Sequence, residues 1–158
     1  MKGNAKIIES LNEILTMELS GINQYFIHSK LCESWGYERL AEKVRKESLS
    51  EMKHAEQVID RILHLDGIPN LQRLDKIKIG EKVSDQFKAD LELEVAAISR
   101  FNKAIALAVE VGDNGSREML EGMLTSEEEH LHWIESQLEL IKQVGEANYL
   151  TQQIYKPE

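Results

Sequence analysis

The sequence predicts an all-helical protein: an antiparallel four-helix bundle with one long crossover connection and a short fifth helix at its C-terminal end. The 158 residues include only two prolines, Pro69 and Pro157, which leaves two long stretches without the residue that interrupts helices. All nine glycines occur singly, and aromatic residues make up 6% of the chain. This composition argues against a β-sandwich, in which turn residues recur about every ten positions.

Four segments carry apolar residues at alternating steps of three and four, which is the spacing of one helix face. The first segment is interrupted at Gly36, and the second ends at Gly67 followed by Pro69, a combination typical of a helix C-terminus. The third ends near Gly112 and the fourth near Gly145. We therefore expect long helices over about 4–35, 38–66, 83–112 and 115–144, and a short one over about 146–155.

The lengths of the connections predict how the helices pair. The links at Gly36 and around Gly112 to Gly115 are short enough to force two antiparallel hairpins. The connection over about 67–82 differs, because roughly 16 extended residues reach about 50 Å, whereas a helix of roughly 28 residues is about 42 Å long. This connection can therefore run the full length of the bundle, and we expect residues 1–158 to form a single domain.

Composition also limits where the protein works and what it binds. Cys32 is the one cysteine, so no intrachain disulfide can form, and a reducing cytoplasm is the expected location. The first residues lack the apolar core of a signal peptide, and no run of about 18 apolar residues predicts a membrane span. The formal net charge of −9 opposes binding to nucleic acid and to anionic membranes, whereas it favours cations.

Polar residues interrupt the apolar stripe of each of the four long helices, at one position in the first and third helices and at two in the second and fourth. A carboxylate buried on such a face without a partner is heavily penalised by its lost hydration, so buried carboxylates are normally paired, protonated or bound to a metal. Several such residues in one bundle need a common explanation. The interrupting residues are Glu18, Glu51, His54, Glu94, Glu127 and, one step aside, His130.

The spacing of these residues supplies that explanation. Glu18 and Glu51 lie 33 residues apart, as do Glu94 and Glu127, and each second glutamate is followed three positions later by a histidine. In both halves the glycine of the turn lies midway between the first glutamate and the histidine, so the two lie level across an antiparallel hairpin. Side chains three apart on a helix can reach one ion. We therefore expect six ligands to converge in the middle of the bundle.

The expected ligand set suits two redox-active metal ions. Four carboxylates with two neutral imidazoles carry a charge of about −4, which two divalent ions neutralise. One histidine per metal among many oxygens favours iron or manganese over zinc, and calcium seldom recruits histidine. The pattern is that of the di-iron carboxylate proteins. A third Glu-x-x-His, Glu129 with His132, lies on the outer face and is expected to be solvated surface.

Spacing alone leaves two interpretations each for Tyr25 and Glu47, and it favours one for Met52. Tyr25 lies two turns after Glu18, where it is either a core tyrosine or a hydrogen-bond partner of a metal ligand. Glu47 lies one turn before Glu51 and is either a carboxylate on an ion route or part of an ion pair at the bundle edge. Met52 turns towards the outer flank of its helix, where spacing favours a packing methionine.

The residues also resemble the bacterioferritin family over nearly the full chain. The stretches that carry the resemblance are MKG at the start, LNEILTMELSGINQYFIHS around Glu18, ESLSEMKHAEQVIDRIL around Glu51, DGIPNLQ in the crossover, SEEEHLHWIESQLELI around Glu127 and NYLTQQI near the end. The resemblance implies a ferritin-like fold and a ferroxidase centre of the same six residues, with Glu51 and Glu127 bridging two irons. It also implies that Met52 is an axial haem ligand, one from each of two subunits.

The resemblance further implies iron storage and detoxification. A ferroxidase with two iron ions per subunit would oxidise Fe(II) with dioxygen or peroxide, and haem b shared between two subunits would carry electrons for release. Homo-oligomerisation into a hollow 24-subunit shell would place the short fifth helix at its four-fold openings. A small [2Fe-2S] ferredoxin would dock near Ile68 and Pro69. Lys46 and Ser50 replace the histidine and aspartate of an inner-surface iron site in some members, which leaves two roles open for the centre, a stable cofactor or the entry pore for iron.

Two other functions share parts of this pattern. A di-iron peroxidase or oxygenase of the rubrerythrin type uses the same ligands. It would require either a substrate pocket or an appended Cys-x-x-Cys pair, and the single cysteine excludes the pair. A non-catalytic haem-binding or metal-binding structural shell would hold metal only to stabilise assembly. A DNA-coating mini-ferritin is disfavoured by the acidic charge and by half-sites placed within one bundle.

Overall fold

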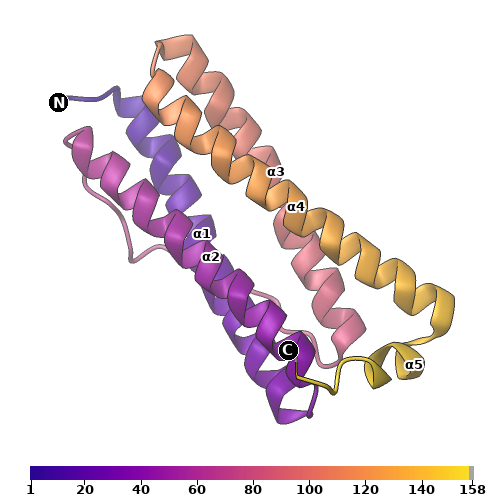
Figure 1. The fold of residues 1–158 in the computed structure, drawn as a ribbon. Coiled ribbons are helices and arrows are strands. Elements are labelled where there is room, and N and C mark those ends of the chain that lie inside the picture. Colours follow the sequence, from indigo (N-terminus) through magenta and orange to yellow (C-terminus); the bar gives the residue numbers. More distant parts are fainter. Residues whose placement is uncertain (157–158) are drawn as a thin grey trace.

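The protein is an all-helical bundle in the computed structural model, which describes residues 1–156 (Figure 1). Four long helices lie side by side and one short helix follows them, as the sequence predicts, and no strand occurs within residues 1–156. The helices are α1 (Ala5–Ser34), α2 (Glu38–His64), α3 (Val83–Val111), α4 (Asn114–Val144) and α5 (Glu146–Thr151).

Two helix ends differ from the expected boundaries. The second helix ends at His64 rather than near residue 66, because Asp66 takes a left-handed φ of 58° and the Gly67 amide bonds back to Ile62 O at 2.9 Å. The fifth helix ends at Thr151 rather than near residue 155. There the carbonyl of Gln153 accepts a hydrogen bond from the Arg39 amide at 3.1 Å, which ties the tail to the start of α2 instead of extending the helix.

Tight turns make two antiparallel hairpins, α1 with α2 and α3 with α4. Gly36 and Gly112 lie in these turns with φ of 88° and 75°. Glycine adopts such left-handed backbone without the penalty that a Cβ would bring. On the far side of the second turn, Asp113 caps α4 and also accepts a hydrogen bond from Arg61 Nη2 at 2.7 Å. This ion pair fastens the end of α2 to the second hairpin.

The crossover between α2 and α3 runs along the polar side of α1 and is held there by side chains. Its backbone amides donate to acceptors on α1 that recur at helical spacing. The bonds join the Asn70 amide to Asn12 Oδ1 (2.8 Å), Asp75 to Ser20 Oγ (2.8 Å), Lys78 to Gln24 Oε1 (3.2 Å) and Gly80 to His28 Nε2 (3.1 Å). The crossover thus spans most of the length of α1, which brings the start of α3 to the same end of the bundle as the turn between α1 and α2.

The bundle has two apolar cores with a polar layer between them. One core surrounds Phe101 and Leu120 near the α3–α4 turn, and the other surrounds Phe87 and Ile134 near the α1–α2 turn. Each of the four long helices contributes to both cores. In every helix the acidic residue that interrupts the apolar stripe lies between its two core segments, so the four acids occupy one layer.

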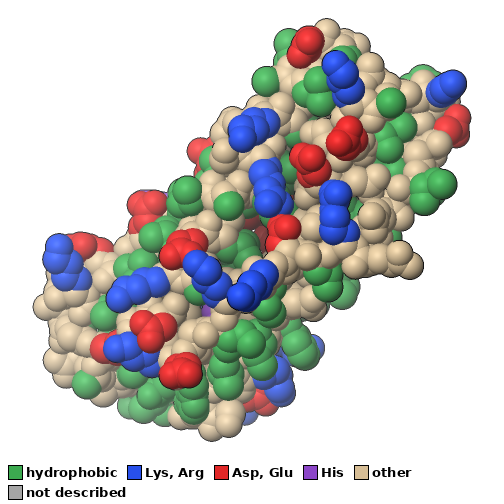
Figure 2. Space-filling model, turned by 180° about the vertical axis from the view of Figure 1, so that it is seen from behind, with side chains coloured by type: hydrophobic (Ala, Val, Ile, Leu, Met, Phe, Trp, Pro, Cys, Tyr) green, Lys and Arg blue, Asp and Glu red, His purple; other side chains and the backbone are tan. Residues whose placement is uncertain are grey.

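The outer surface mixes charges of both signs. Figure 2 views the molecule from behind, opposite to Figure 1, and shows acidic and basic side chains interspersed with apolar ones on that face. Over residues 1–156, no helix is long and apolar enough to cross a membrane.

Candidate metal centre

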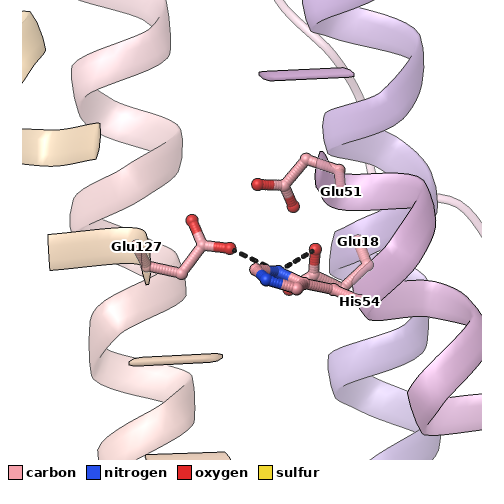
Figure 3. A group of neighbouring side chains, drawn as sticks. All are labelled: Glu18, Glu51, His54 and Glu127. Atoms are coloured by element: carbon pink, nitrogen blue, oxygen red, sulfur yellow. Dashed lines mark hydrogen bonds and ion pairs between the residues drawn. The ribbon is translucent and has the colours of Figure 1, made fainter. Parts of the chain in front are cut away.

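Four side chains from three helices meet in the polar layer (Figure 3). Glu18 comes from α1, Glu51 and His54 from α2, and Glu127 from α4. Each offers one ligand atom, and these atoms all lie within 4.8 Å of one another. The His54 ring lies between two of the acids, with Nδ1 3.2 Å from Glu127 Oε1 and 3.6 Å from Glu18 Oε2. Ligand atoms this close to one another can all contact a single metal ion.

Glu94 of α3 and His130 of α4 pair with each other beside this group of four and are not part of it. His130 Nδ1 lies 2.9 Å from Glu94 Oε1 and 3.4 Å from Glu47 Oε2. Glu94 also accepts a short hydrogen bond from the Tyr25 hydroxyl. Both histidines therefore turn Nδ1 towards carboxylates inside the bundle.

The carboxylates of this layer are buried and incompletely satisfied. Glu18 and Glu94 have no exposed surface, and Glu51 and Glu127 are 4% and 1% exposed. Within residues 1–156, three buried side-chain oxygen or nitrogen atoms lack a hydrogen-bond partner: both carboxylate oxygens of Glu18 and Oε2 of Glu94. Such atoms are costly in a protein interior unless a cation satisfies them. The orphaned oxygens lie on the first glutamate of each half-site.

Burial and mutual repulsion raise the pKa values of the four carboxyls. Burial is the largest cause in every case, and it raises the pKa of Glu18 and Glu51 well above their ordinary range and that of Glu94 to about 8. Neighbouring carboxylates act in the same direction, as Glu51 does on the pKa of Glu127. For His54, burial acts to lower the pKa, but the bond with Glu127 and the nearby carboxylates outweigh it and the pKa is raised. The metal-free layer therefore holds protons that an entering cation would displace.

We expect Glu94→Gln to stabilise the metal-free protein in a pH-dependent way. The pKa of Glu94 is about 8 in the folded protein against an ordinary value of 4.5, so between these values the folded state binds more protons than the unfolded state. Stability of the parent should therefore fall as pH rises from about 4.5 to about 8, and glutamine removes this loss. In denaturant unfolding at pH 8, the variant should exceed the parent by on the order of a few kcal/mol.

The matched control is Glu121→Gln, which changes an exposed glutamate of α4. This control should show no comparable pH-dependent gain, and the advantage of Glu94→Gln should shrink towards pH 4.5. Adding Mn(II) should stabilise the parent more than Glu94→Gln, because glutamine cannot offer a charged carboxylate to a cation. A Glu94→Gln variant that is less stable than the parent at pH 8 without metal would contradict the conclusion that burial penalises the charged form of this carboxyl.

The structure places both residues with two interpretations beside the layer. Tyr25 is fully buried and its hydroxyl donates to Glu94, so the hydrogen-bonding interpretation describes its contacts. Glu47 is partly buried, and its carboxylate pairs with Lys43 at 2.8 Å while its other oxygen faces His130. Glu47 thus connects the layer with the surface between α2 and α4, which is compatible with both of its interpretations.

Other sequence candidates lie outside the layer. Met52 lies on α2 beside Glu51 but is 47% exposed, so it is not a packed methionine within this subunit. Glu129 and His132 are both exposed, as expected for the third Glu-x-x-His. Cys32 is buried, and burial raises the pKa of its thiol to about 12, which fits a small buried apolar side chain rather than a nucleophile.

Two residues that contact the side chains of the layer were not predicted from the sequence. Gly21 lies one turn after Glu18 on α1 and faces α2, where a Cβ on Gly21 would lie 3.3 Å from Glu51 Oε2, so glycine leaves room for the carboxylate. Trp133 stacks on the His130 ring with centroids 6.1 Å apart. For Gly21, the available signal was a single glycine within a long helix. The sequence around Trp133 indicates only an ordinary core aromatic residue.

A buried network of polar side chains lies next to the layer, on the side of the α1–α2 turn. Asp90 of α3 accepts hydrogen bonds from Gln24 Nε2 at 2.8 Å and from His28 Nδ1 at 2.9 Å. The opposite ring nitrogen of His28 accepts the Gly80 amide, which fixes the neutral tautomer of the imidazole. Spacing placed His28 in neither half-site. Its contacts join α1, α3 and the crossover one turn away from Tyr25 and Glu94.

Comparison with known proteins agrees with this architecture. Residues 8–144 match the family described as "Ferritin-like domain". The chain is 45% identical to "Bacterioferritin" of Mycobacterium leprae (strain TN) over 157 residues, covering 99% of both chains. It is 44% identical to "Bacterioferritin BfrA" of Mycobacterium tuberculosis (strain ATCC 25618 / H37Rv), again with 99% of both covered. It is 46% identical to "Bacterioferritin" of Streptomyces coelicolor over 151 residues, covering 96% of this chain and 90% of that protein. The chain therefore belongs to the bacterioferritin family of ferritin-like proteins.

Proposed function

We propose that this protein stores iron and acts as a ferroxidase, with Fe(II) as its substrate. The observation that carries the proposal is the buried layer of four carboxylates and two histidines, in which Glu18 and Glu94 leave three oxygens without partners. Membership of the bacterioferritin family supports the same function. The six ligands would be Glu18, Glu51, His54, Glu94, Glu127 and His130.

The ligands divide between two iron sites. Glu18 with His54 would hold one Fe(II), and Glu94 with His130 would hold the other. Glu51 and Glu127 come from opposite hairpins, and neighbouring acids raise the pKa of each. As the family resemblance implies, their carboxylates would be shared between the two ions. Two divalent ions neutralise four carboxylates, which removes the repulsion that raises those pKa values.

The reaction balances over two iron ions. Two Fe(II) become two Fe(III), and the two electrons reduce dioxygen with two protons to hydrogen peroxide, or hydrogen peroxide with two protons to two water molecules. Carboxyl groups that are protonated in the metal-free layer release protons when Fe(II) binds. The hydroxyl of Tyr25 orients Glu94, and Glu47 faces His130, so both would support ligands rather than bind iron directly.

Haem b would be held between two subunits by Met52. The thioether is a suitable axial ligand for haem iron, and the side chain lies on an exposed flank. Leu49 and Phe26 are also large apolar side chains with nearly half of their surface exposed, 47% and 49%. A flat apolar macrocycle and a second copy of the chain would cover such side chains. Bound haem would supply an electron route into the stored mineral.

The assembly would be a hollow homo-oligomeric shell of 24 subunits with α5 at its four-fold openings. Ile68 is 85% exposed and Leu71 is 53% exposed after the end of α2. These side chains, with Pro69, would form the docking site of a small [2Fe-2S] ferredoxin that feeds electrons to the haem. Because Lys46 and Ser50 stand where some relatives carry an inner iron site, the di-iron centre itself would pass iron to the interior.

Rapid mixing of metal-free protein with Fe(II) and oxygen tests the proposal. A fast phase of oxidation should saturate at two Fe(II) per subunit, because each half-site takes one ion. A slower phase at higher iron loading should follow as mineral forms. Metal-dependent melting with no fast oxidation would instead favour a structural shell that binds metal only to stabilise its assembly.

A further inference from the structure

A wide pocket opens beside the metal layer, between the first half of α2, the second half of α4 and α5. Its volume is about 850 Å³. In Figure 1 the first half of α2 and the second half of α4 lie apart in the lower half of the view, and α5 lies below the end of α4. Trp133 and Leu40 form apolar parts of its wall, and Gln137, Asn148 and Gln152 contribute neutral polar groups.

The pocket is basic, although the protein as a whole carries a net charge of −9. Arg39, Lys43 and Lys46 line it, and Glu42 is the one acid in its lining. The three cations follow one another at steps of four and three, so they lie along one face of α2. Lys46 meets Glu42 at 3.3 Å, but both side chains are largely exposed, so this pair holds the cation weakly.

Lys43 connects this pocket with the metal layer. Its Nζ lies 2.8 Å from Glu47 Oε1 and 4.9 Å from the centroid of the Trp133 ring. The other oxygen of Glu47 lies 3.4 Å from His130 Nδ1, and Trp133 stacks on the same imidazole. Two side chains, Glu47 and Trp133, therefore separate the basic pocket from a ligand of the second half-site.

We propose that this pocket binds inorganic phosphate or a closely similar multiply charged oxyanion. Guanidinium and ammonium groups spaced along one helix face provide several charged donors for the oxygens of one compact anion. The amide side chains of Gln137 and Asn148 can add neutral donors. A singly charged anion would engage only part of this set, whereas a dianion can be contacted by two or three cations at once.

The role of the site rests on the proposed ferroxidase function. Fe(III) that leaves the second half-site past His130 and Glu47 would meet an oxyanion held by Lys43 and Lys46. Phosphate oxygens are hard ligands that suit Fe(III), so the bound anion would accept the ion and neutralise its charge. Lysine at position 46 would then hold the counter-anion of the mineral rather than iron itself.

Isothermal titration of inorganic phosphate into the metal-free, full-length assembly tests the site independently of iron oxidation. The parent should bind phosphate, and the double variant Lys43→Gln/Lys46→Gln should bind it at least tenfold more weakly. A separate Arg39→Gln variant should also weaken binding. The matched control, Lys88→Gln/Lys103→Gln, removes the same charge from exposed positions of α3 outside the pocket and should bind like the parent.

Each outcome bears on the proposal. No phosphate binding by the parent, or equal loss in the α2 and α3 double variants, would overturn the site, since the latter shows a general effect of charge. Size exclusion of every variant confirms that assembly is intact. Because no iron is present, a negative result here leaves the ferroxidase proposal standing, and slow iron oxidation in the parent would leave phosphate binding unaffected.

Discussion

Replacing Glu18 or Glu94 with alanine should slow the fast phase of Fe(II) oxidation by roughly 100-fold or more, since losing even a group that only supports a metal ligand typically costs 10- to 100-fold. Each variant removes the first glutamate of one half-site, and with it the oxygens that have no protein partner. Two electrons must leave two neighbouring ions together, so the loss of one site should disable both. Stopped-flow absorbance of Fe(III) formation measures the rate.

The control is Glu129→Ala, which removes an exposed glutamate from the outer face of α4. It should oxidise Fe(II) as fast as the parent. Circular dichroism and size exclusion should show that all three variants keep the helical fold and the assembly, because three of the four carboxylate oxygens of Glu18 and Glu94 have no protein partner in the metal-free protein. Fast oxidation by Glu18→Ala and Glu94→Ala would show that the centre lies elsewhere.

Met52→Leu should abolish haem binding while leaving the fast phase of Fe(II) oxidation within about twofold of the parent. Leucine keeps the size and apolar character of the side chain but has no sulfur to bind haem iron. Met52 is 47% exposed and turned away from the metal layer, so its loss should not disturb the carboxylates. The absorbance of the haem Soret band per subunit, after reconstitution with haem b, measures the effect.

Met119→Leu is the matched control, because Met119 packs against the core near the α3–α4 turn. It should keep the parental haem content. A Met52→Leu variant that still binds haem with an unchanged spectrum would mean that another residue supplies the axial ligand. Loss of fast iron oxidation in Met52→Leu would contradict the separation of the haem site from the metal layer.

The fold class followed from the sequence because each long helix is amphipathic and each turn is marked by glycine. The exceptions are ends that depend on distant contacts. The helix of the tail ends near Gln153, whose carbonyl accepts a hydrogen bond from the Arg39 amide. A local sequence pattern cannot indicate a hydrogen-bond partner more than a hundred residues away. The path of the crossover likewise depends on acceptors such as Ser20 and Gln24, which look like ordinary polar residues on a helix.

The candidate centre was predictable because charged residues are rare on apolar stripes and these are duplicated at one spacing. Spacing cannot predict how far a side chain extends from its helix or which atoms it contacts. The contacts of Tyr25 with Glu94 and of Glu47 with both Lys43 and His130 depend on rotamers and on the distance between helices. The space that Gly21 leaves for Glu51 is a property of two helices packed together, and neither segment shows it alone.

The central claim is that six residues bind two iron ions within one subunit. Anomalous diffraction at the iron absorption edge, from crystals soaked anaerobically in Fe(II), tests it most directly. We expect two strong peaks per subunit, one between Glu18 and His54 and one between Glu94 and His130, with Glu51 and Glu127 in contact with both. A single peak, or iron bound only outside this layer, would contradict the account.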